Sequence, residues 1–222
     1  MIDLISVDNM RESDASTIAS GTPGLVLMER AALGIYRSYA KWGCSKSINI
    51  VTGSGNNGGD GFALALILKE QKLPVTIFTM SEKATEDAGY YKNLCVSKGI
   101  RMVPFGSADL DGDIIVDCML GTGFKGVPRD NYRSAIEEIN NSGAYVISAD
   151  INSGMNGDTG EYECCVRSDL TVTIGYLKKG LITPEALKMT GKITVADIGI
   201  ALNKKEASID ETSYGISVIT VR

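Results

Sequence analysis

Short apolar runs alternate with longer amphipathic stretches along most of the chain. Runs of four to eight β-branched and apolar residues are typical of buried strands, and apolar positions three to four residues apart indicate helices that face a core. The expected strands span residues 47–52, 75–80, 100–103, 113–120, 144–150, 170–174, 192–197 and 216–220, and the expected helices span 6–20, 25–42, 62–70, 85–98 and 132–141. This alternation predicts an α/β fold with a mainly parallel sheet, helices on both faces, and a single domain over residues 1–222.

A glycine-rich loop separates the first of these strands from its helix. Residues 53–61 read Gly-Ser-Gly-Asn-Asn-Gly-Gly-Asp-Gly. A strand that turns through glycines into a helix gathers backbone N–H groups and the positive end of the helix dipole at one point, which favours phosphate binding. The loop has the Gly-x-Gly-x-x-Gly spacing of dinucleotide sites but lacks the Gly-Lys-Ser/Thr of a Walker loop. Asn56, Asn57 and Asp60 add amide and carboxylate groups that a simple pyrophosphate site does not require.

Two more polar loops follow predicted strands, at residues 121–129 and 150–160. In a parallel sheet the C-terminal ends of the strands share one edge, so these loops and the glycine-rich loop are expected to meet there. Asp117 interrupts the apolar run at 113–120, where an unpaired carboxylate would be unfavourable. A bound cation would explain that position.

Composition narrows the classes of function that stay open. The 222-residue chain has a net charge of −5 and no dense lysine or arginine cluster, so general nucleic-acid binding is not expected. No apolar run reaches about 18 residues and the first residues lack a basic segment, so neither a membrane span nor a signal peptide is expected. Five scattered cysteines favour a reducing, cytoplasmic location. The absence of histidine excludes Ser-His-Asp and Cys-His catalysis, and leaves acid–base work to carboxylates, lysines, tyrosines or water.

Several segments carry a resemblance to a known family. They are residues 55–61 (Gly-Asn-Asn-Gly-Gly-Asp-Gly), 116–126 (Val-Asp-Cys-Met-Leu-Gly-Thr-Gly-Phe-Lys-Gly), 150–154 (Asp-Ile-Asn-Ser-Gly) with 158–160 (Asp-Thr-Gly), and 195–200 (Val-Ala-Asp-Ile-Gly-Ile), with a looser match at 25–31. The chain resembles the YjeF N-terminal domain family, the NAD(P)H-hydrate epimerases, from about Ser6 to Leu202. The resemblance implies a Rossmann-like three-layer αβα sandwich and an isomerase of nicotinamide nucleotide repair.

The resemblance also implies roles for particular residues. The implied contacts to the hydrated NADH or NADPH are Asn56, Asn57, Gly58, Gly59, Asp60, Gly121, Thr122, Gly123, Phe124, Lys125, Gly126, Val127 and Asp150. The implied cofactor is potassium, with Asn57, Asp117 and Ser153 as ligands. An amide, a carboxylate and a hydroxyl form an oxygen-only shell that suits a hard cation. The family further implies a fused or separate ADP- or ATP-dependent hydrate dehydratase, and the helices before Gly43 leave a homodimer open.

The implied reaction interconverts the R and S hydrates at C6 of the nicotinamide ring. The hydroxyl there is next to the ring nitrogen, so its C–O bond can break to give a cation to which water returns on the other face. A carboxylate that alternates between acid and base would serve, with Asp150 as first candidate and Asp60 as second. Two other functions stay open, a non-catalytic nucleotide-binding scaffold of the same fold and an NAD-dependent oxidoreductase. The oxidoreductase lacks an acidic residue near the end of the strand at 75–80, where the first is Glu82.

These residues also have ordinary structural interpretations. Asp60 could cap the following helix, Asn56 and Asn57 could be turn residues, Asp150 could cap a strand end, Ser153 could be a turn serine, and Lys125 could be a solvated lysine rather than a phosphate partner. Two positions depart from the family pattern. Asn152 stands where proline is common, which removes a restraint on φ next to Ser153, and Arg30 replaces an asparagine often seen in the second helix.

Overall fold

An eight-stranded parallel sheet forms the centre of the computed structural model, which describes residues 1–221. Across the sheet the strands are β11 (Ser217–Thr220), β9 (Lys192–Asp197), β7 (Leu170–Ile174), β6 (Tyr145–Ala149), β5 (Ile114–Cys118), β2 (Ile48–Thr52), β3 (Val75–Thr79) and β4 (Arg101–Pro104). Each neighbouring pair is parallel. All eight strands expected from the sequence are therefore confirmed, with ends that differ by one or two residues.

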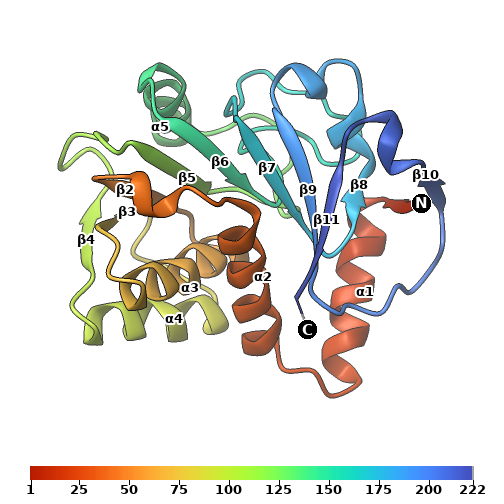
Figure 1. The fold of residues 1–222 in the computed structure, drawn as a ribbon, viewed down its shortest axis with the longest axis horizontal. Helices are drawn as coiled ribbons and strands as arrows, with labels where there is room; N and C mark the ends of the chain where they lie inside the picture. The colour runs from red at the N-terminus through yellow and green to blue at the C-terminus, as the bar shows by residue number, and fades with distance from the viewer. Residues whose placement is uncertain (222) are drawn as a thin grey trace.

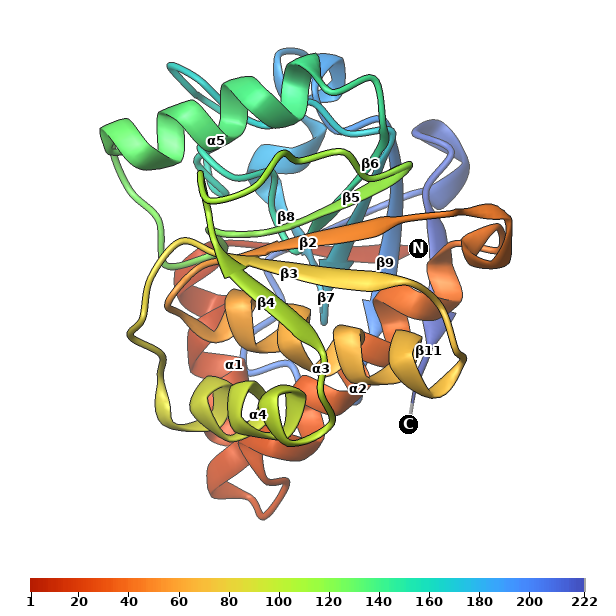
Figure 2. The same cartoon turned by 90° about the vertical axis from the view of Figure 1, so that its left-hand side faces the viewer.

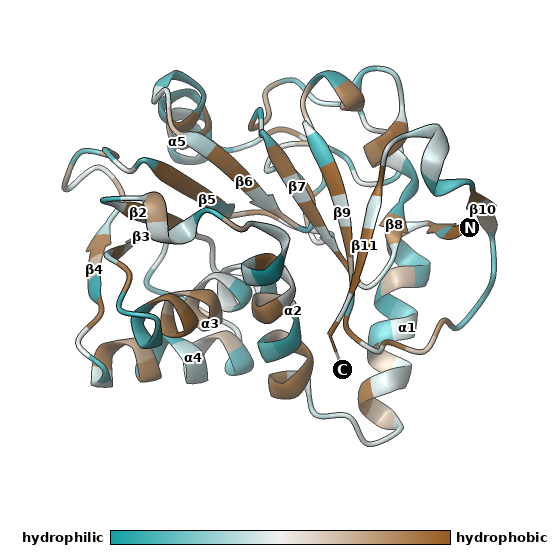
Figure 3. Cartoon of the chain, viewed as in Figure 1, coloured by the Kyte–Doolittle hydropathy of each residue, from teal (hydrophilic) through white to brown (hydrophobic). Residues whose placement is uncertain are grey.

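Helices cover both faces of this sheet (Figures 1 and 2). On one face lie α2 (Gly24–Ser38), α3 (Asn56–Glu70) and α4 (Glu86–Ser97), and on the other lies α5 (Asp130–Asn141). The central strands β2, β5 and β7 are buried along their whole length because they face helices or loops on both sides. Figure 3 shows β5 and β7 as largely apolar ribbons. The three-layer αβα sandwich is confirmed.

The order of the strands reverses between β2 and β5. From β2 the chain builds outward to β3 and β4, then returns to place β5 on the other side of β2 and continues to β6, β7, β9 and β11. The ends of the two central strands lie together, because Thr52 pairs with Cys118 and Gly53 N donates to Cys118 O at 3.0 Å. Open parallel sheets bind their ligands at such a reversal.

Two helix boundaries differ from the sequence prediction. The helix expected at 62–70 begins at Asn56, so most of the glycine-rich loop is its first turn and a half. Asp60 therefore lies inside the helix and does not cap it, and Asn56 and Asn57 are helical rather than turn residues; the N-cap is Gly55. The helix expected at 25–42 ends at Ser38 and a short 3₁₀ turn follows at Trp42–Cys44.

A second, three-stranded sheet was not predicted. Its strands are β1 (Ile2–Ile5), β8 (Leu177–Lys178) and β10 (Ala207–Ile209), with β1 in the middle, antiparallel to β10 and parallel to β8. Helix α1 (Val7–Ala19) follows β1 with Ser6 as its N-cap, as the sequence predicts. The remaining 3₁₀ turns are Lys179–Ile182, Ala186–Lys188 and Glu211–Ser213. Within residues 1–221 no helix has the length and apolar character needed to cross a membrane.

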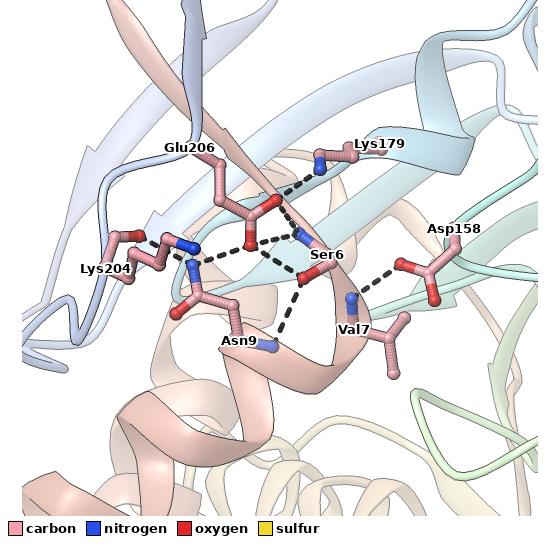
Figure 4. A network of polar contacts seen from close by, with 7 residues as sticks. All are labelled: Ser6, Val7, Asn9, Asp158, Lys179, Lys204 and Glu206. Atoms are coloured by element: carbon pink, nitrogen blue, oxygen red, sulfur yellow. Dashed lines mark hydrogen bonds and ion pairs between the residues drawn. The ribbon is translucent and has the colours of Figure 1, made fainter.

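Helix α1 is fixed at its start by a polar network (Figure 4). The Glu206 carboxylate accepts from Ser6 Oγ at 2.7 Å and from Asn9 Nδ2 at 2.8 Å, and it pairs with Lys179. On the other side, Val7 N donates to a carboxylate oxygen of the 157–160 turn at 2.7 Å. These contacts hold the N-terminal helix against segments from the second half of the chain, and so fix the side chains that α1 presents to the sheet edge.

Candidate functional site

A cavity of about 770 Å³ opens at the reversal point of the sheet. Its wall is formed by the start of α3, by the loop that follows β5, by the first residue after β6, and by side chains of α1 and α2. The three loops expected to converge do contribute to this wall. Its volume lies in the range of small-molecule and nucleotide sites, about 300–1,000 Å³.

Close packing explains the glycines at the start of α3. A Cβ at Gly58 would lie 2.2 Å from Gly53 O, and a Cβ at Gly59 would lie 2.5 Å from the end of Met28 and 3.1 Å from Ala88 Cα. Only glycine lets the first turn of the helix approach the strand end and the neighbouring helices so closely. The N-terminal N–H groups of α3 and its dipole are thereby brought to the wall of the cavity.

Asp150 lies at the inner wall of this cavity, directly after β6, in an uncommon backbone conformation. Its φ is +67°, in the left-handed region, and its N–H donates to Val172 O at 2.8 Å. Its Oδ1 accepts a 2.5 Å hydrogen bond from Lys178 Nζ, and its Oδ2 accepts a 3.4 Å contact from Thr122 N. Asp150 therefore links the sheet edge to the loop after β5, and does more than cap a strand end.

Three more carboxylates line the cavity, Asp60 from α3, Asp14 from α1 and Asp87 from α4. Burial raises the pKa of Asp60 well above its usual value, the negative charges of Asp150 and Asp14 raise it further, and Lys178 opposes them. Burial also raises the pKa of Asp14, Lys178 lowers it, and Asp150 raises it. Charge repulsion and desolvation thus favour a neutral carboxyl at Asp60, while Asp150 has a cationic partner.

The three residues implied as potassium ligands surround one short segment, residues 119–121. Asp117 is fully buried, and its carboxylate accepts from Ser153 Oγ at 2.5 Å and from the N–H of residue 119 at 3.2 Å. Ser153 Oγ also accepts from the N–H of residue 120 at 2.9 Å. A Cβ at Gly121 would lie 3.2 Å from Asn57 Cβ. The structure therefore brings the loops after β2, β5 and β6 together at these residues.

The donor set at this segment fits a hard cation. Burial raises the pKa of Asp117, and hydrogen bonds from Ser153, Met119 and Ser148 lower it. Both amide atoms of Asn57 are buried and have no hydrogen-bond partner in the structure, which is unusual for a buried amide and indicates a missing ligand. Within residues 1–221, no cluster of three or more His, Cys, Asp or Glu side chains has the arrangement of a metal site. A shell built mainly from neutral oxygens fits these observations.

The two departures from the family pattern have structural explanations. Asn152 is fully buried, and its Nδ2 donates to Val166 O at 2.9 Å, Ser168 Oγ at 2.9 Å and Met189 O at 3.1 Å. Its Oδ1 accepts from the side chain of residue 171 at 2.9 Å. Hydrogen bonds thus restrain the loop where proline would restrain it by its ring. Arg30 donates to the carbonyl of residue 198 at 3.1 Å, which ties α2 to the segment after β9.

Most of the residues implied by the resemblance lie at the cavity. Asn56, Asn57, Asp60, Gly121, Thr122, Gly123, Phe124, Lys125, Val127 and Asp150 line it, while Gly58, Gly59 and Gly126 do not, and Asp117 and Ser153 lie behind the wall. Asn56 Oδ1 also accepts from Thr85 Oγ1 at 2.7 Å, which connects α3 to the start of α4.

Five charged residues of the wall are not among the predicted site residues. Arg11 and Asp14 come from α1, Asp87 from α4, Arg129 from the N-cap of α5, and Lys178 from β8. Arg11 donates to the carbonyl of Thr122 at 2.7 Å. Arg129 belongs to the loop at 121–129 that was expected at this edge. For Lys178 the only signal is its place in a short apolar run after a buried strand, which does not by itself put the side chain at the cavity. Nothing in the pattern of α1 separates Arg11 or Asp14 from solvated charges.

The chain matches a known protein family and several named relatives. The family described as YjeF-related protein N-terminus matches residues 24–180. A protein of Limosilactobacillus fermentum named NAD(P)H-hydrate epimerase is 35% identical over 198 residues, which cover 87% of this chain and 95% of the relative. One of Lentilactobacillus buchneri with the same name is 37% identical, over 90% of this chain and 96% of the relative.

Longer relatives match as well. The bifunctional NAD(P)H-hydrate repair enzyme Nnr of Archaeoglobus fulgidus is 37% identical over 90% of this chain but only 42% of the relative. The chain thus spans about two fifths of the length of such bifunctional relatives. Among solved structures, yeast YNL200c superposes with a TM-score of 0.74 at 19% identity, over 96% of this chain and 98% of the other. At that identity the likeness is one of fold.

Proposed function

The chain belongs to the family of the YjeF-related protein N-terminus, and on this premise we propose that it is an NAD(P)H-hydrate epimerase, an isomerase that interconverts the R and S hydrates of NADH and NADPH. This chain covers nearly the whole length of two relatives with this name. The observation that carries the proposal is a nucleotide-sized cavity in which the start of a helix faces the carboxylate of Asp150.

Helix α3 and the loop after β5 hold the nucleotide in this proposal. The free N–H groups at the start of α3 and its dipole bind the phosphates, with Asn56, Asn57 and Asp60 in the same wall. Loop residues 121–125 and 127 line the same cavity, and Lys125 adds a positive charge. Gly58 and Gly59 act by letting the helix approach, since their own atoms do not line the cavity.

Asp150 and Asp60 carry the chemistry. Asp60, favoured as the neutral acid, protonates the C6 hydroxyl, the C–O bond breaks, and water leaves behind a ring cation. Water then adds to the other face of C6 and gives its proton to Asp150, the carboxylate. One proton is delivered and one is taken up, so the enzyme ends in the protonation state from which the reverse reaction starts. Two carboxyl groups in different surroundings, Asp60 buried near other carboxylates and Asp150 paired with Lys178, suit this division of roles.

Potassium is the cofactor that we propose for the buried site at residues 119–121. Asn57, Asp117 and Ser153 would hold it, and its charge would fix the substrate-binding loops and attract the nucleotide phosphates. The test is thermal unfolding in KCl, NaCl and choline chloride at equal ionic strength. We expect a higher melting temperature in KCl, lost in Ser153→Ala. Equal melting temperatures in all three salts would refute the site.

We further propose a single domain over residues 1–222 that acts before a hydrate dehydratase, fused or separate, because bifunctional relatives exist. Free thiols at all five cysteines agree with the reducing, cytoplasmic location that the composition favours. A homodimer through the N-terminal helices stays a prediction, and its test is the mass of the protein in solution by light scattering.

The epimerase proposal is tested with the separated hydrates of NADH and NADPH. The R or the S hydrate is incubated with the purified protein, and the ratio of the two is followed by chromatography. We expect a much faster approach to the equilibrium ratio than with heat-denatured protein. If the protein binds the hydrates and does not change the rate, the proposal fails and a nucleotide-binding scaffold replaces it.

A further inference from the structure

A buried lysine lies in the cavity wall beside Asp150. Lys178 is 1% exposed, and its Nζ donates to Asp150 Oδ1 at 2.5 Å, to Ile174 O at 2.6 Å and to Thr173 Oγ1 at 3.2 Å. An ammonium group has three N–H bonds, and these three acceptors use all of them. Lys178 therefore has no donor left for a substrate, although its side chain borders the cavity.

The lysine determines which oxygen of Asp150 is free. Oδ1 is occupied by Lys178 and receives a second, 3.4 Å contact from Ile174 N. Oδ2 has a single long contact, 3.4 Å from Thr122 N, and lies 3.2 Å from the place where a Cβ of Gly121 would be. Oδ2 thus faces the loop after β5 and the cavity, and it retains acceptor capacity.

We propose that Lys178 is a positioning residue for the epimerisation, which holds the side chain of Asp150 with Oδ2 turned toward C6 of the bound hydrate. The effect of Lys178 on the rate rests on the proposed epimerase function. The placement of Asp150 Oδ2 rests on the structure alone. Because all its N–H groups are engaged, Lys178 acts through Asp150 and does not touch the substrate.

The small sheet has a function in this proposal. Lys178 is the second residue of β8, which pairs with β1 so that Ile5 is opposite Lys178. The turn between β7 and β8 passes through Gly175 at φ +74° and returns the chain toward β7. The ammonium is in this way brought under the end of the main sheet, next to Asp150. The N-terminal strand thus supports a side chain at the reaction site.

The buried ion pair between Lys178 and Asp150 is stable only with both partners present. A buried ammonium without a counter-charge is strongly unfavourable, and breaking a buried pair on one side is more harmful than replacing both partners. The backbone of Asp150, with φ at +67°, sets the direction of its side chain, and the shortest contact that then fixes the carboxylate is the 2.5 Å one from Lys178, since those from Ile174 N and Thr122 N are 3.4 Å long. Without Lys178, the carboxylate is free to turn either oxygen toward water, so catalysis suffers more than substrate binding does.

Kinetics of matched lysine variants test the proposal once the wild-type protein is shown to equilibrate the hydrates. We expect Lys178→Gln to lower kcat about 100-fold with KM within about threefold, because the lost contact orients a reacting group. Lys178→Arg, which keeps the charge, should recover at least about tenfold of that loss. The control is Lys188→Gln, an exposed lysine that pairs with Glu185 away from the cavity and should keep kcat within about twofold.

A structural arm separates this proposal from the proposed function. In a crystal structure of Lys178→Met we expect the Asp150 carboxylate to be rotated, with Oδ2 no longer next to Thr122 N. An unmoved carboxylate overturns the proposal even if the wild-type protein is an epimerase, and so does a folded Lys178→Gln protein with wild-type kcat. If the Lys178 variants fail to fold, Thr173→Val replaces them, because it removes one anchor of the lysine. This variant should lower kcat at unchanged KM, and a wild-type kcat for Thr173→Val overturns the proposal. If the wild-type protein does not equilibrate the hydrates, the proposed function fails and the rotation still decides the geometry.

Discussion

Removal of the Asn152 side chain is the sharpest test of how the active-site loop is supported. Asn152→Ala deletes an amide whose two N–H bonds are shared among three acceptors, Val166 O, Ser168 Oγ and Met189 O, and whose Oδ1 accepts from Thr171 Oγ1. Three of these partners keep another bond. Ser168 Oγ is 2.6 Å from the hydroxyl of residue 148, Met189 O accepts from Ser168 N, and Thr171 Oγ1 donates to the carbonyl of residue 190. Within residues 1–221, Val166 O has no other protein partner.

The expected loss of stability follows from this inventory. One buried carbonyl left without a partner lowers the free energy of unfolding by about 1–3 kcal/mol, and the void left by the amide lowers it by about 1 kcal/mol more. The free energy of unfolding should therefore fall by about 2–4 kcal/mol. For a chain of 222 residues this corresponds to a melting temperature lower by about 5–12 °C.

Chemical and thermal unfolding of three proteins provide the measurement. Asn141→Ala is the matched control, because Asn141 is exposed at the end of α5, and its stability should change by less than about 0.5 kcal/mol. An Asn152→Ala protein as stable as this control would refute the reasoning. It would mean that water or a shifted backbone satisfies Val166 O, and that the loop does not depend on its asparagine.

Three further predictions concern the reaction, the helix packing and the N-terminal network. Asp150→Asn should lower kcat for the hydrates at least about 100-fold, because the acceptor of the proton is lost; a rate within tenfold of wild type in the chromatographic assay would contradict the assignment. Gly59→Ala should lower the free energy of unfolding by about 1–3 kcal/mol, because its Cβ would lie 2.5 Å from Met28 and 3.1 Å from Ala88 Cα; Gly89→Ala, whose Cβ meets no atom within 4 Å, is its control in urea unfolding. Hydrogen bonds from Lys179 and Ser6 lower the pKa of Glu206 from 4.5 to about 2, so its contribution to stability is complete above about pH 4.5 and is lost as the pH falls toward 2. The difference in unfolding free energy between the wild-type protein and Glu206→Gln should be about 1 kcal/mol at pH 6, after allowance for solvent screening, and should shrink at pH 3; a difference that grows on acidification would contradict this sign.

The main sheet was predictable because its strands carry their own signal. Runs such as Ile48–Thr52 and Leu170–Ile174 are β-branched, are bounded by turns and are buried on both sides, so their composition alone identifies them. The strands of the small sheet have two to four residues, and β1 pairs with β10 about 200 positions away, Ile2 with Ile209. Segments this short have no periodicity to detect.

The start of α3 shows a different limit. Asn56-Asn57-Gly58-Gly59 has low intrinsic helix propensity, which predicts a loop, yet the segment is helical. Tertiary packing outweighs the propensity, because the glycines let the helix approach Gly53 O, Met28 and Ala88. Sequence spacing could place Asp150 and the loop after β5 at one edge of the sheet. It could not place Lys178 or Asp14 there, since their positions depend on how β8 and α1 pack.

The loop from Asp150 to Ser153 joins these observations. Within four residues, one side chain binds Lys178 at the cavity, Asn152 enters the core below it, and Ser153 donates to Asp117 on the neighbouring strand. A non-glycine residue in the left-handed region persists only where its surroundings determine the backbone on several sides, and this loop meets that condition. Proline, which is common at this position in the family, and the asparagine of this chain restrain the loop in different ways. A proline ring would restrain φ directly, while the asparagine amide restrains this backbone through its hydrogen-bond contacts. The left-handed conformation is thereby retained at Asp150, whose side chain lines the cavity.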